Sequence, residues 1–191
     1  MPMEAQDPPG KSHAPLAEPS AWVRRWAPLV RAGGPVLDVA CGSGRHALLF
    51  AALGHPVDAV DRDPAAIAAL AAQVGIRALC ADIEGGPWPY AGRQYAGVVV
   101  TNYLHRPLFP LLMAALEPGG VLIYETFAQG NAAYGRPANP DFLLQRGELL
   151  RAVGDAQVVA YEDRYVDQPK PAVVQRICAV VADRAIRENP F

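Results

Sequence analysis

Short runs of apolar residues recur along the chain, and most of them end at a polar residue or a glycine. Buried parallel strands are nearly continuous in apolar residues, so we expect a strand at each run. Five runs predict strands: the first begins at Val36 and contains Asp38, and the others span residues 57–61, 76–81, 95–101 and 121–126.

Segments with helix signals separate these runs. Ser20 can cap a first helix whose apolar residues recur at helical spacing, and Asp63 followed by a proline opens a later one. The first predicted helix begins at Ser20 and ends before Gly33. The other three span residues 45–53, 64–74 and 107–116. Alternating strands and helices predict a doubly wound α/β fold, with a mostly parallel sheet covered by helices on both faces.

The end of the chain departs from this alternation. Two strand-like runs, 157–166 and 177–182, are joined by residues 167–175 with no helix signal between them. The Pro-Lys-Pro sequence at 169–171 suits a connecting turn, so we expect an antiparallel hairpin that completes a seven-stranded sheet. The opening residues 1–19 are rich in proline and small polar residues and predict a disordered tail, which leaves one domain over residues 20–191.

Composition narrows the class of protein. The 191 residues are 51% hydrophobic and 19% charged, with a net charge of −2, which favours one globular domain and gives no electrostatic signal for nucleic acid. The three cysteines, Cys41, Cys80 and Cys178, are far apart and suggest neither a disulfide framework nor a metal site. We see no membrane span or secretory signal and expect a cytoplasmic location. The sequence carries no signal for an oligomeric state.

A turn with two glycines follows the first predicted strand, in the order Val36-Leu-Asp-Val-Ala-Cys-Gly-Ser-Gly-Arg-His-Ala47. Gly42 and Gly44 let the backbone turn tightly and approach a ligand, which indicates a nucleotide-binding loop; a ligand-free turn is the alternative. Asp61 ends the next strand at about the 20-residue distance of a carboxylate that accepts hydrogen bonds from ribose. Asp82 follows the third strand, where it can meet an adenine amino group.

This order of acids and glycines resembles the class I S-adenosylmethionine-dependent methyltransferases, over residues 22–183. The resemblance implies S-adenosylmethionine as cofactor and a Rossmann-like methyltransferase fold. Ala40 stands where many members have glycine. By the same resemblance Asp61 would hold the ribose hydroxyls, Arg62 would lie near the adenine face, and Asp82 with the Ile83 backbone would bind the adenine edge. The cofactor-binding residues implied are Asp38, Ala40, Gly42, Gly44, Asp61, Arg62, Asp82, Ile83 and Asn102.

A nicotinamide-dependent oxidoreductase is the main competitor, because residues 42–47 also fit the dinucleotide pattern Gly-x-Gly-x-x-Gly/Ala. Asp38 argues against it, since a carboxylate there would repel a pyrophosphate and attract the ammonium group of S-adenosylmethionine. Most such oxidoreductases also need a separate substrate domain, for which the chain has no room. The methyltransferase is the better prediction.

The segment after the fourth strand, residues 101–107, occupies the place where the family puts residues beside the methyl group. It lacks the Asn/Asp-Pro-Pro-aromatic motif of methyltransferases that act on base or glutamine amino groups. The catalytic candidates are His105, as a general base, and Tyr103; alternatively His105 begins the next helix and Tyr103 packs over the cofactor. At the end of the fifth strand and on the loop after it, Glu125 and Arg136 are the substrate-binding candidates. Arg136 would bind an anionic group; alternatively it is a solvated loop arginine.

The sequence therefore predicts a methyltransferase that acts on a small-molecule acceptor by in-line displacement. The short core places it nearest a tellurite-resistance and small-molecule branch of the family. The alternatives are a protein or RNA methyltransferase that needs a partner, and a non-catalytic S-adenosylmethionine-binding partner protein.

Overall fold

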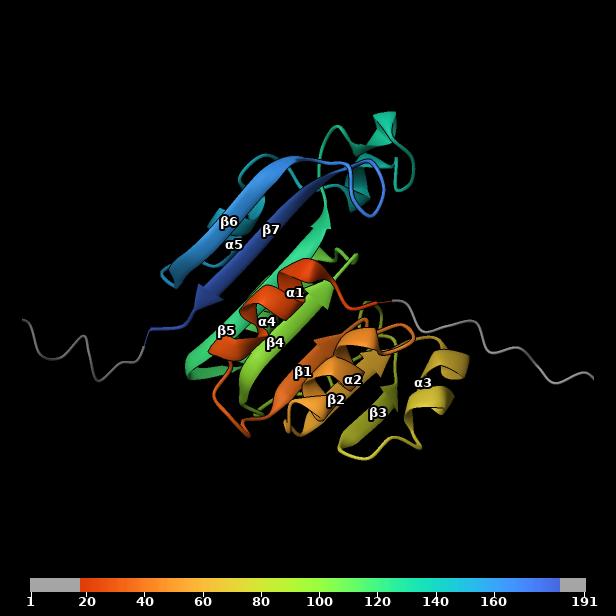
Figure 1. Ribbon diagram of the computed structural model, residues 1–191, viewed down its shortest axis with the longest axis vertical. Coiled ribbons are helices and arrows are strands. Elements are labelled where there is room, and N and C mark those ends of the chain that lie inside the picture. Colours follow the sequence, from red (N-terminus) through yellow and green to blue (C-terminus); the bar gives the residue numbers. More distant parts are fainter. Residues whose placement is uncertain (1–17, 183–191) are drawn as a thin grey trace, which may run out of the picture.

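The computed structural model describes residues 18–182, so most of the predicted tail, 1–17, lies outside the described residues. Within that range a sheet of seven strands runs in the order β3-β2-β1-β4-β5-β7-β6 (Figure 1). The strands are β1 Val36–Val39, β2 Val57–Asp61, β3 Ile76–Cys80, β4 Tyr95–Thr101, β5 Leu116–Phe127, β6 Gln157–Val166 and β7 Ala172–Val180. The helices are α1 Ala21–Trp26, α2 Arg45–Ala52, α3 Pro64–Leu70, α4 Phe109–Ala114 and α5 Glu148–Ala152, with short 3-10 turns at Ala27–Leu29, Arg106–Leu108, Asn131–Ala133 and Pro140–Phe142.

The sheet has the predicted mixed character. Strands β1 to β5 pair in parallel, whereas β7 is antiparallel to both β5 and β6. Because β1 to β5 are parallel, their carboxyl ends meet at one edge of the sheet, where the acids that follow them are gathered. The doubly wound fold and the terminal hairpin are confirmed.

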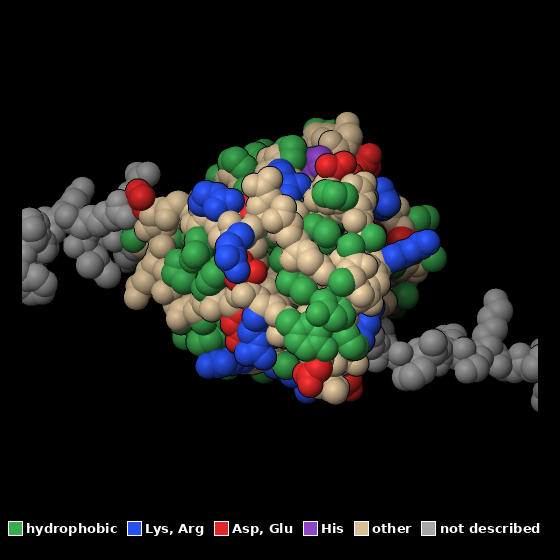
Figure 2. All heavy atoms as spheres, turned by 90° about the horizontal axis from the view of Figure 1, so that it is seen from above, with side chains coloured by type: hydrophobic (Ala, Val, Ile, Leu, Met, Phe, Trp, Pro, Cys, Tyr) green, Lys and Arg blue, Asp and Glu red, His purple; other side chains and the backbone are tan. Residues whose placement is uncertain are grey.

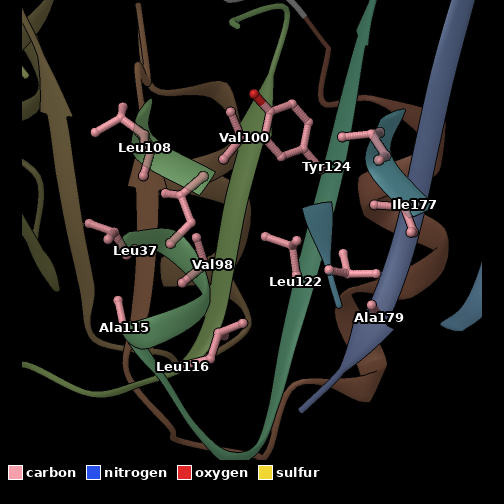
Figure 3. Close-up of a cluster of buried hydrophobic side chains, with 14 of the residues drawn as sticks. Leu37, Val98, Val100, Leu108, Ala115, Leu116, Leu122, Tyr124, Ile177 and Ala179 are labelled. Atoms are coloured by element: carbon pink, nitrogen blue, oxygen red, sulfur yellow. The ribbon is translucent and has the colours of Figure 1, made fainter. Parts of the chain in front are cut away.

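Two hydrophobic cores lie on the two faces of the sheet. One contains side chains of α1, α2 and α3, such as Val23, Phe50 and Ile67, packed on the sheet. The other contains Leu112 of α4 and Leu149 of α5. Figure 3 shows how β4, β5 and β7 contribute alternate residues to this second core. Helices cover both faces, as the alternation of elements predicts.

Several predicted boundaries are wrong. The first helix stops at Trp26 and continues as a 3-10 turn, because Pro28 has no N–H to donate. The helix expected at 64–74 ends at Leu70. Residues 107–116 divide into a 3-10 turn and α4, and Leu116 instead starts β5, where it pairs with Tyr95.

The hairpin is tighter than expected. Strand β7 begins at Ala172, five positions before the predicted start at 177, so the connection shortens to residues 167–171. The Pro-Lys-Pro turn lies within this connection. Helix α5 was not predicted, and it covers β7 through a hydrogen bond from the Leu149 N–H to Gln175 Oε1, 3.2 Å.

Candidate functional site

A cavity of about 330 Å³ opens at the carboxyl ends of the parallel strands. Its volume lies within the range of small-molecule sites. It brings together many of the residues that the sequence singled out. The predicted site residues among its walls are Ala40, Asp61, Arg62, Asp82, Ile83, Asn102 and Tyr103.

The loop between β1 and α2 has the tight left-handed backbone that its glycines predict. Gly42 and Gly44 have φ values of +52° and +79°, and Ala40 has the same sign at +52°. At Gly44 a Cβ atom would lie 2.3 Å from Leu70 Cδ2 on α3, so only glycine fits there without a shift. Neither glycine lines the cavity; both shape the loop that does.

Asp61 ends β2 beside this loop. Its Oδ2 accepts a hydrogen bond from the Gly42 N–H at 2.8 Å, and its Oδ1 accepts one from the Asp63 N–H at 3.0 Å. A carboxylate oxygen has two acceptor positions, so each oxygen retains one for a ligand hydroxyl. The side chain is half-buried in the cavity wall.

Asp38 lies deeper than the sequence suggested. It is buried in β1, its Oδ2 accepts a hydrogen bond from the Ala47 N–H at 2.9 Å, and it is not among the cavity walls. Burial raises the pKa of this carboxyl to about 7. The group therefore joins β1 to the first turn of α2 and acts on the cavity through the loop.

Asp82 occupies the adjacent wall, after β3. Its Oδ1 accepts hydrogen bonds from the N–H groups of Glu84, at 2.9 Å, and Gly85, at 3.2 Å. These two bonds, with help from the Arg62 charge, hold the pKa of Asp82 below its usual value. Asp82 is thus an ionised acceptor next to the buried side chain of Ile83.

Asn102 and Tyr103 follow β4 at the mouth of the cavity. Asn102 has φ +54°, and its N–H donates to the Glu125 carbonyl oxygen at 2.9 Å. The Tyr103 hydroxyl is buried without a hydrogen-bond partner among residues 18–182. Burial and the nearby Glu84 carboxylate raise the pKa of Tyr103, so this phenol stays protonated and can donate.

His105 and Arg136 are not brought into this cavity. His105 precedes the 3-10 turn at Arg106–Leu108, in agreement with the alternative that it starts the next helical segment. Arg136 is exposed on the loop after β5, beside a shallow hollow that includes Asn139 and Phe142.

The loop after β5 forms the roof of the cavity through Pro137 and Phe142, two residues that the sequence did not single out. Arg106 holds this loop in place: its Nη1 and Nη2 donate to the carbonyl oxygens of Asp141, at 2.7 Å, and Leu143, at 3.0 Å. The same guanidinium pairs with Glu148, with an Nε to Oε1 distance of 2.7 Å. No local sequence pattern indicates these contacts of Arg106, because its partners are more than thirty residues away along the chain.

A second cavity, of about 580 Å³, adjoins the first, and Asn102 and Phe127 line both. Its walls come from residues 18–21, the start of α2, the end of β5 and the β6–β7 hairpin. Glu125 lines it. Its Oε1 accepts from the Ser20 hydroxyl at 2.8 Å, and its Oε2 lies 2.5 Å from Arg176 Nε.

His46 is hydrogen-bonded to Ser20, a residue of the same wall. Its Nε2 accepts a hydrogen bond from the Ser20 N–H at 3.1 Å, and its Nδ1 lies 3.3 Å from the Thr101 hydroxyl. Burial lowers the pKa of His46 to about 3, with a smaller contribution from Arg45. The ring is therefore neutral near pH 7, and Nδ1 carries the proton.

Among residues 18–182, no group of three or more His, Cys, Asp or Glu side chains could hold a metal ion. None of the helices in that range is long and apolar enough to cross a membrane.

Comparison with known proteins agrees with this geometry. A family model described as a methyltransferase domain matches residues 36–120. Ribosomal RNA small subunit methyltransferase H of Gemmatimonas aurantiaca is 28% identical over 141 residues, which cover 74% of this chain and 44% of that protein. The chain thus spans less than half the length of this curated relative.

Solved structures share the fold. TehB from Haemophilus influenzae superposes with a TM-score of 0.69 at 18% identity, over 84% of this chain and 61% of that one. The glycopeptide N-methyltransferase MtfA, solved with S-adenosyl-L-homocysteine, superposes with a TM-score of 0.61 at 20% identity, over 87% and 91% of the two chains. Residues 36–120 are thus similar to a methyltransferase domain, and the chain shares the Rossmann-like fold of S-adenosylmethionine-dependent methyltransferases, with the glycine loop and the acids after β2 and β3 at its carboxyl-end cavity.

Proposed function

We propose that this protein transfers a methyl group from S-adenosylmethionine to a small-molecule acceptor. The observation that carries the proposal is the charge of the first cavity. Its walls hold the carboxylates of Asp61, Asp82 and Glu84 against the single guanidinium of Arg62. An acidic cavity favours a ligand with a cationic sulfonium and ammonium, and it disfavours the pyrophosphate of a nicotinamide cofactor.

The walls also offer the hydrogen-bond acceptors that this cofactor needs. Asp61 would accept from the ribose hydroxyls at its two remaining positions, and Asp82 with the Ile83 backbone would bind the adenine edge. Arg62 would lie beside the adenine face. The loop at Ala40, held by Asp38 from beneath, would wrap the methionine part.

When bound, the cofactor supplies a methyl carbon attached to a positively charged sulfur, which leaves as a neutral thioether. The chain's contribution to such a displacement is alignment of the two reactants. Asn102 and Phe127 lie where the cavities meet, so the acceptor atom would approach from the second cavity. Tyr103 lines only the first cavity, so its hydroxyl would donate within that cavity, whereas His105 lines neither of these two cavities and is not placed to take a proton from the acceptor.

An RNA substrate is the second candidate, because one curated relative is a ribosomal RNA methyltransferase. The charge distribution favours the small molecule. The face seen in Figure 2 carries Lys and Arg side chains interspersed with Asp and Glu, without a continuous basic surface, and the net charge is −2. RNA-binding proteins present a basic surface to the phosphate backbone.

Calorimetric titration with S-adenosylmethionine, S-adenosylhomocysteine and NADH tests the proposal. We expect micromolar binding of the first two and none of NADH. Asp61→Ala removes charge-assisted hydrogen bonds of roughly 1.5–3 kcal/mol, which weakens binding by about 10- to 150-fold. Asp63→Ala is the matched control, because its carboxylate caps α3 and does not line the cavity. Binding of NADH alone, or equal affinity of the Asp61→Ala variant, would contradict the proposal.

A further inference from the structure

The second cavity differs from the first in charge and in its apolar wall. Phe127, Val166, Ala172 and Val174 all line it, and they form a small hydrophobic cluster separate from the two cores of the sheet. This cluster lies at the end of the β6–β7 hairpin and β5. These side chains give the cavity an apolar wall that is part of neither main core.

The acidic side chains of this cavity are already paired. Glu125 faces Arg176 and the Ser20 hydroxyl, and the Glu18 carboxylate pairs with Arg24. Arg176 also pairs with Glu162, at 3.2 Å, so its charge is used within the wall.

Two cations of the cavity have no such partner. Lys170, on the connection between β6 and β7, is exposed and makes no ion pair with residues 18–182. Arg45, at the start of α2, donates to the Glu18 carbonyl oxygen at 3.2 Å and forms no ion pair within that same range. The cavity therefore presents two available positive charges beside an apolar wall.

We propose that the second cavity binds a small organic acid, with its carboxylate held by Lys170 and Arg45 and its apolar part packed on Phe127 and Val174. This deepens the proposed function, on which it rests, by naming the chemical class of the methyl acceptor. A basic acceptor cavity beside an acidic cofactor cavity also separates the two ligands. The basic cavity repels the cationic sulfonium of the cofactor, and the acidic cavity repels the carboxylate of the acceptor.

The test compares 3-phenylpropionate, its neutral amide and the matching amine, titrated by NMR with and without saturating S-adenosylhomocysteine. We expect the acid to bind roughly three- to tenfold more tightly than the amide, and the amine more weakly than both. Lys170→Gln and Arg45→Gln should each lower the affinity for the acid by roughly threefold to tenfold without changing that for the amide. Lys170→Arg should keep the acid affinity.

Arg164→Gln is the control, because it removes the same charge from the same hairpin outside the cavity. Equal binding of acid and amide, preference for the amine, no binding of the acid, or an unchanged acid affinity in both cavity variants would overturn the proposal. The S-adenosylhomocysteine titration reports separately on the proposed function: cofactor binding without acid selectivity rejects only the acceptor class.

Discussion

Ala40 carries backbone strain that a glycine would relieve. Its φ of +52° lies in the left-handed region, where the Cβ of an L-residue approaches the following carbonyl oxygen. A glycine at this position would avoid that contact, because it has no Cβ. The position lines the first cavity, so the strain sits where the loop meets the proposed cofactor.

We predict that Ala40→Gly stabilises the protein by about 1 kcal/mol. The strain relieved at positive φ exceeds the cost of the extra conformational entropy that glycine gives the unfolded chain. Urea unfolding measures the change. Gly42→Ala is the converse control: it has the same φ and no atom within 4 Å of the added Cβ, so it should destabilise by a similar amount. A less stable Ala40→Gly variant would contradict the assignment of strain.

Single residues show how far the site could be predicted from sequence. Asp61, Asp82 and Asn102 reach the first cavity because each stands at or just after the carboxyl end of a parallel strand. Arg176 was missed because the predicted last strand began one residue after it, whereas Arg176 lies in β7 opposite Glu125. Long-loop residues such as Arg136 could not be placed, because no repeating hydrogen-bond pattern fixes the path of that loop.

Among the elements, three strands are joined by a buried carboxylate far from the cavities. Asp58 lies near the start of β2, and it accepts hydrogen bonds from the Tyr95 hydroxyl at 2.6 Å, Arg77 Nε at 2.8 Å and Arg93 Nη1 at 2.9 Å. These partners belong to β4, β3 and the segment before β4. The cluster fixes the amino ends of the strands relative to one another.

Tyr95→Phe should therefore cost about 1.5–3 kcal/mol of unfolding free energy, since it removes a hydrogen bond to a buried charge. Affinity for S-adenosylhomocysteine should not change. Tyr90→Phe is a close control, because the Tyr90 hydroxyl is buried without a partner in the described part of the chain, and its loss should cost less than about 0.5 kcal/mol. Equal losses in denaturant unfolding would show that the Asp58 bond contributes nothing.

The roof loop depends on one side chain from another element. Arg106→Lys keeps the charge but cannot reach Glu148 and two carbonyl oxygens together, because an ammonium lacks the planar fork of a guanidinium. We expect faster amide exchange over residues 137–145 and roughly three- to tenfold weaker binding of S-adenosylhomocysteine. Arg146→Lys, on an exposed position, should change neither measurement.

The elements themselves were predictable where local signals are strong. The strands at 57–61 and 95–101 have the predicted bounds, and Asp63 caps α3 with its side chain. The misplaced boundaries fall where tertiary pairing decides. Leu116 extends β5 because it pairs with Tyr95, and Ala172 joins β7 because it pairs with Val166.

At the scale of the whole molecule, two buried groups give stability opposite dependences on pH. The folded-state pKa of Asp38 is raised to about 7 from 3.8, so its contribution to stability is greatest below that lower value and is lost as pH rises toward 7. The pKa of His46 is lowered to about 3 from 6.5, so its contribution is greatest above 6.5 and is lost as pH falls. Between pH 3.8 and pH 6.5, a rise in pH therefore reduces the contribution of Asp38 to stability and increases that of His46.

We predict that Asp38→Asn makes the protein more sensitive to acid between about pH 4 and pH 6.5, by at most about 1.4 kcal/mol per pH unit. His46→Gln should have the opposite effect on the slope, because glutamine can still accept from the Ser20 N–H without taking up a proton. Urea unfolding across this range measures both slopes. The double variant should return close to the slope of the natural chain, and two single variants with slopes of the same sign would refute the pairing.

The division of the two cavities along the chain has a consequence for protein engineering. All but a few walls of the first cavity come from the segments that follow β1 to β4, whereas most walls of the second come from residues 18–21 and the β6–β7 hairpin. Only Asn102 and Phe127 belong to both. A library confined to the hairpin connection, residues 167–171, would therefore vary the proposed acceptor cavity and leave the walls of the first cavity unchanged, while β7 keeps Ile177 and Ala179 in the core.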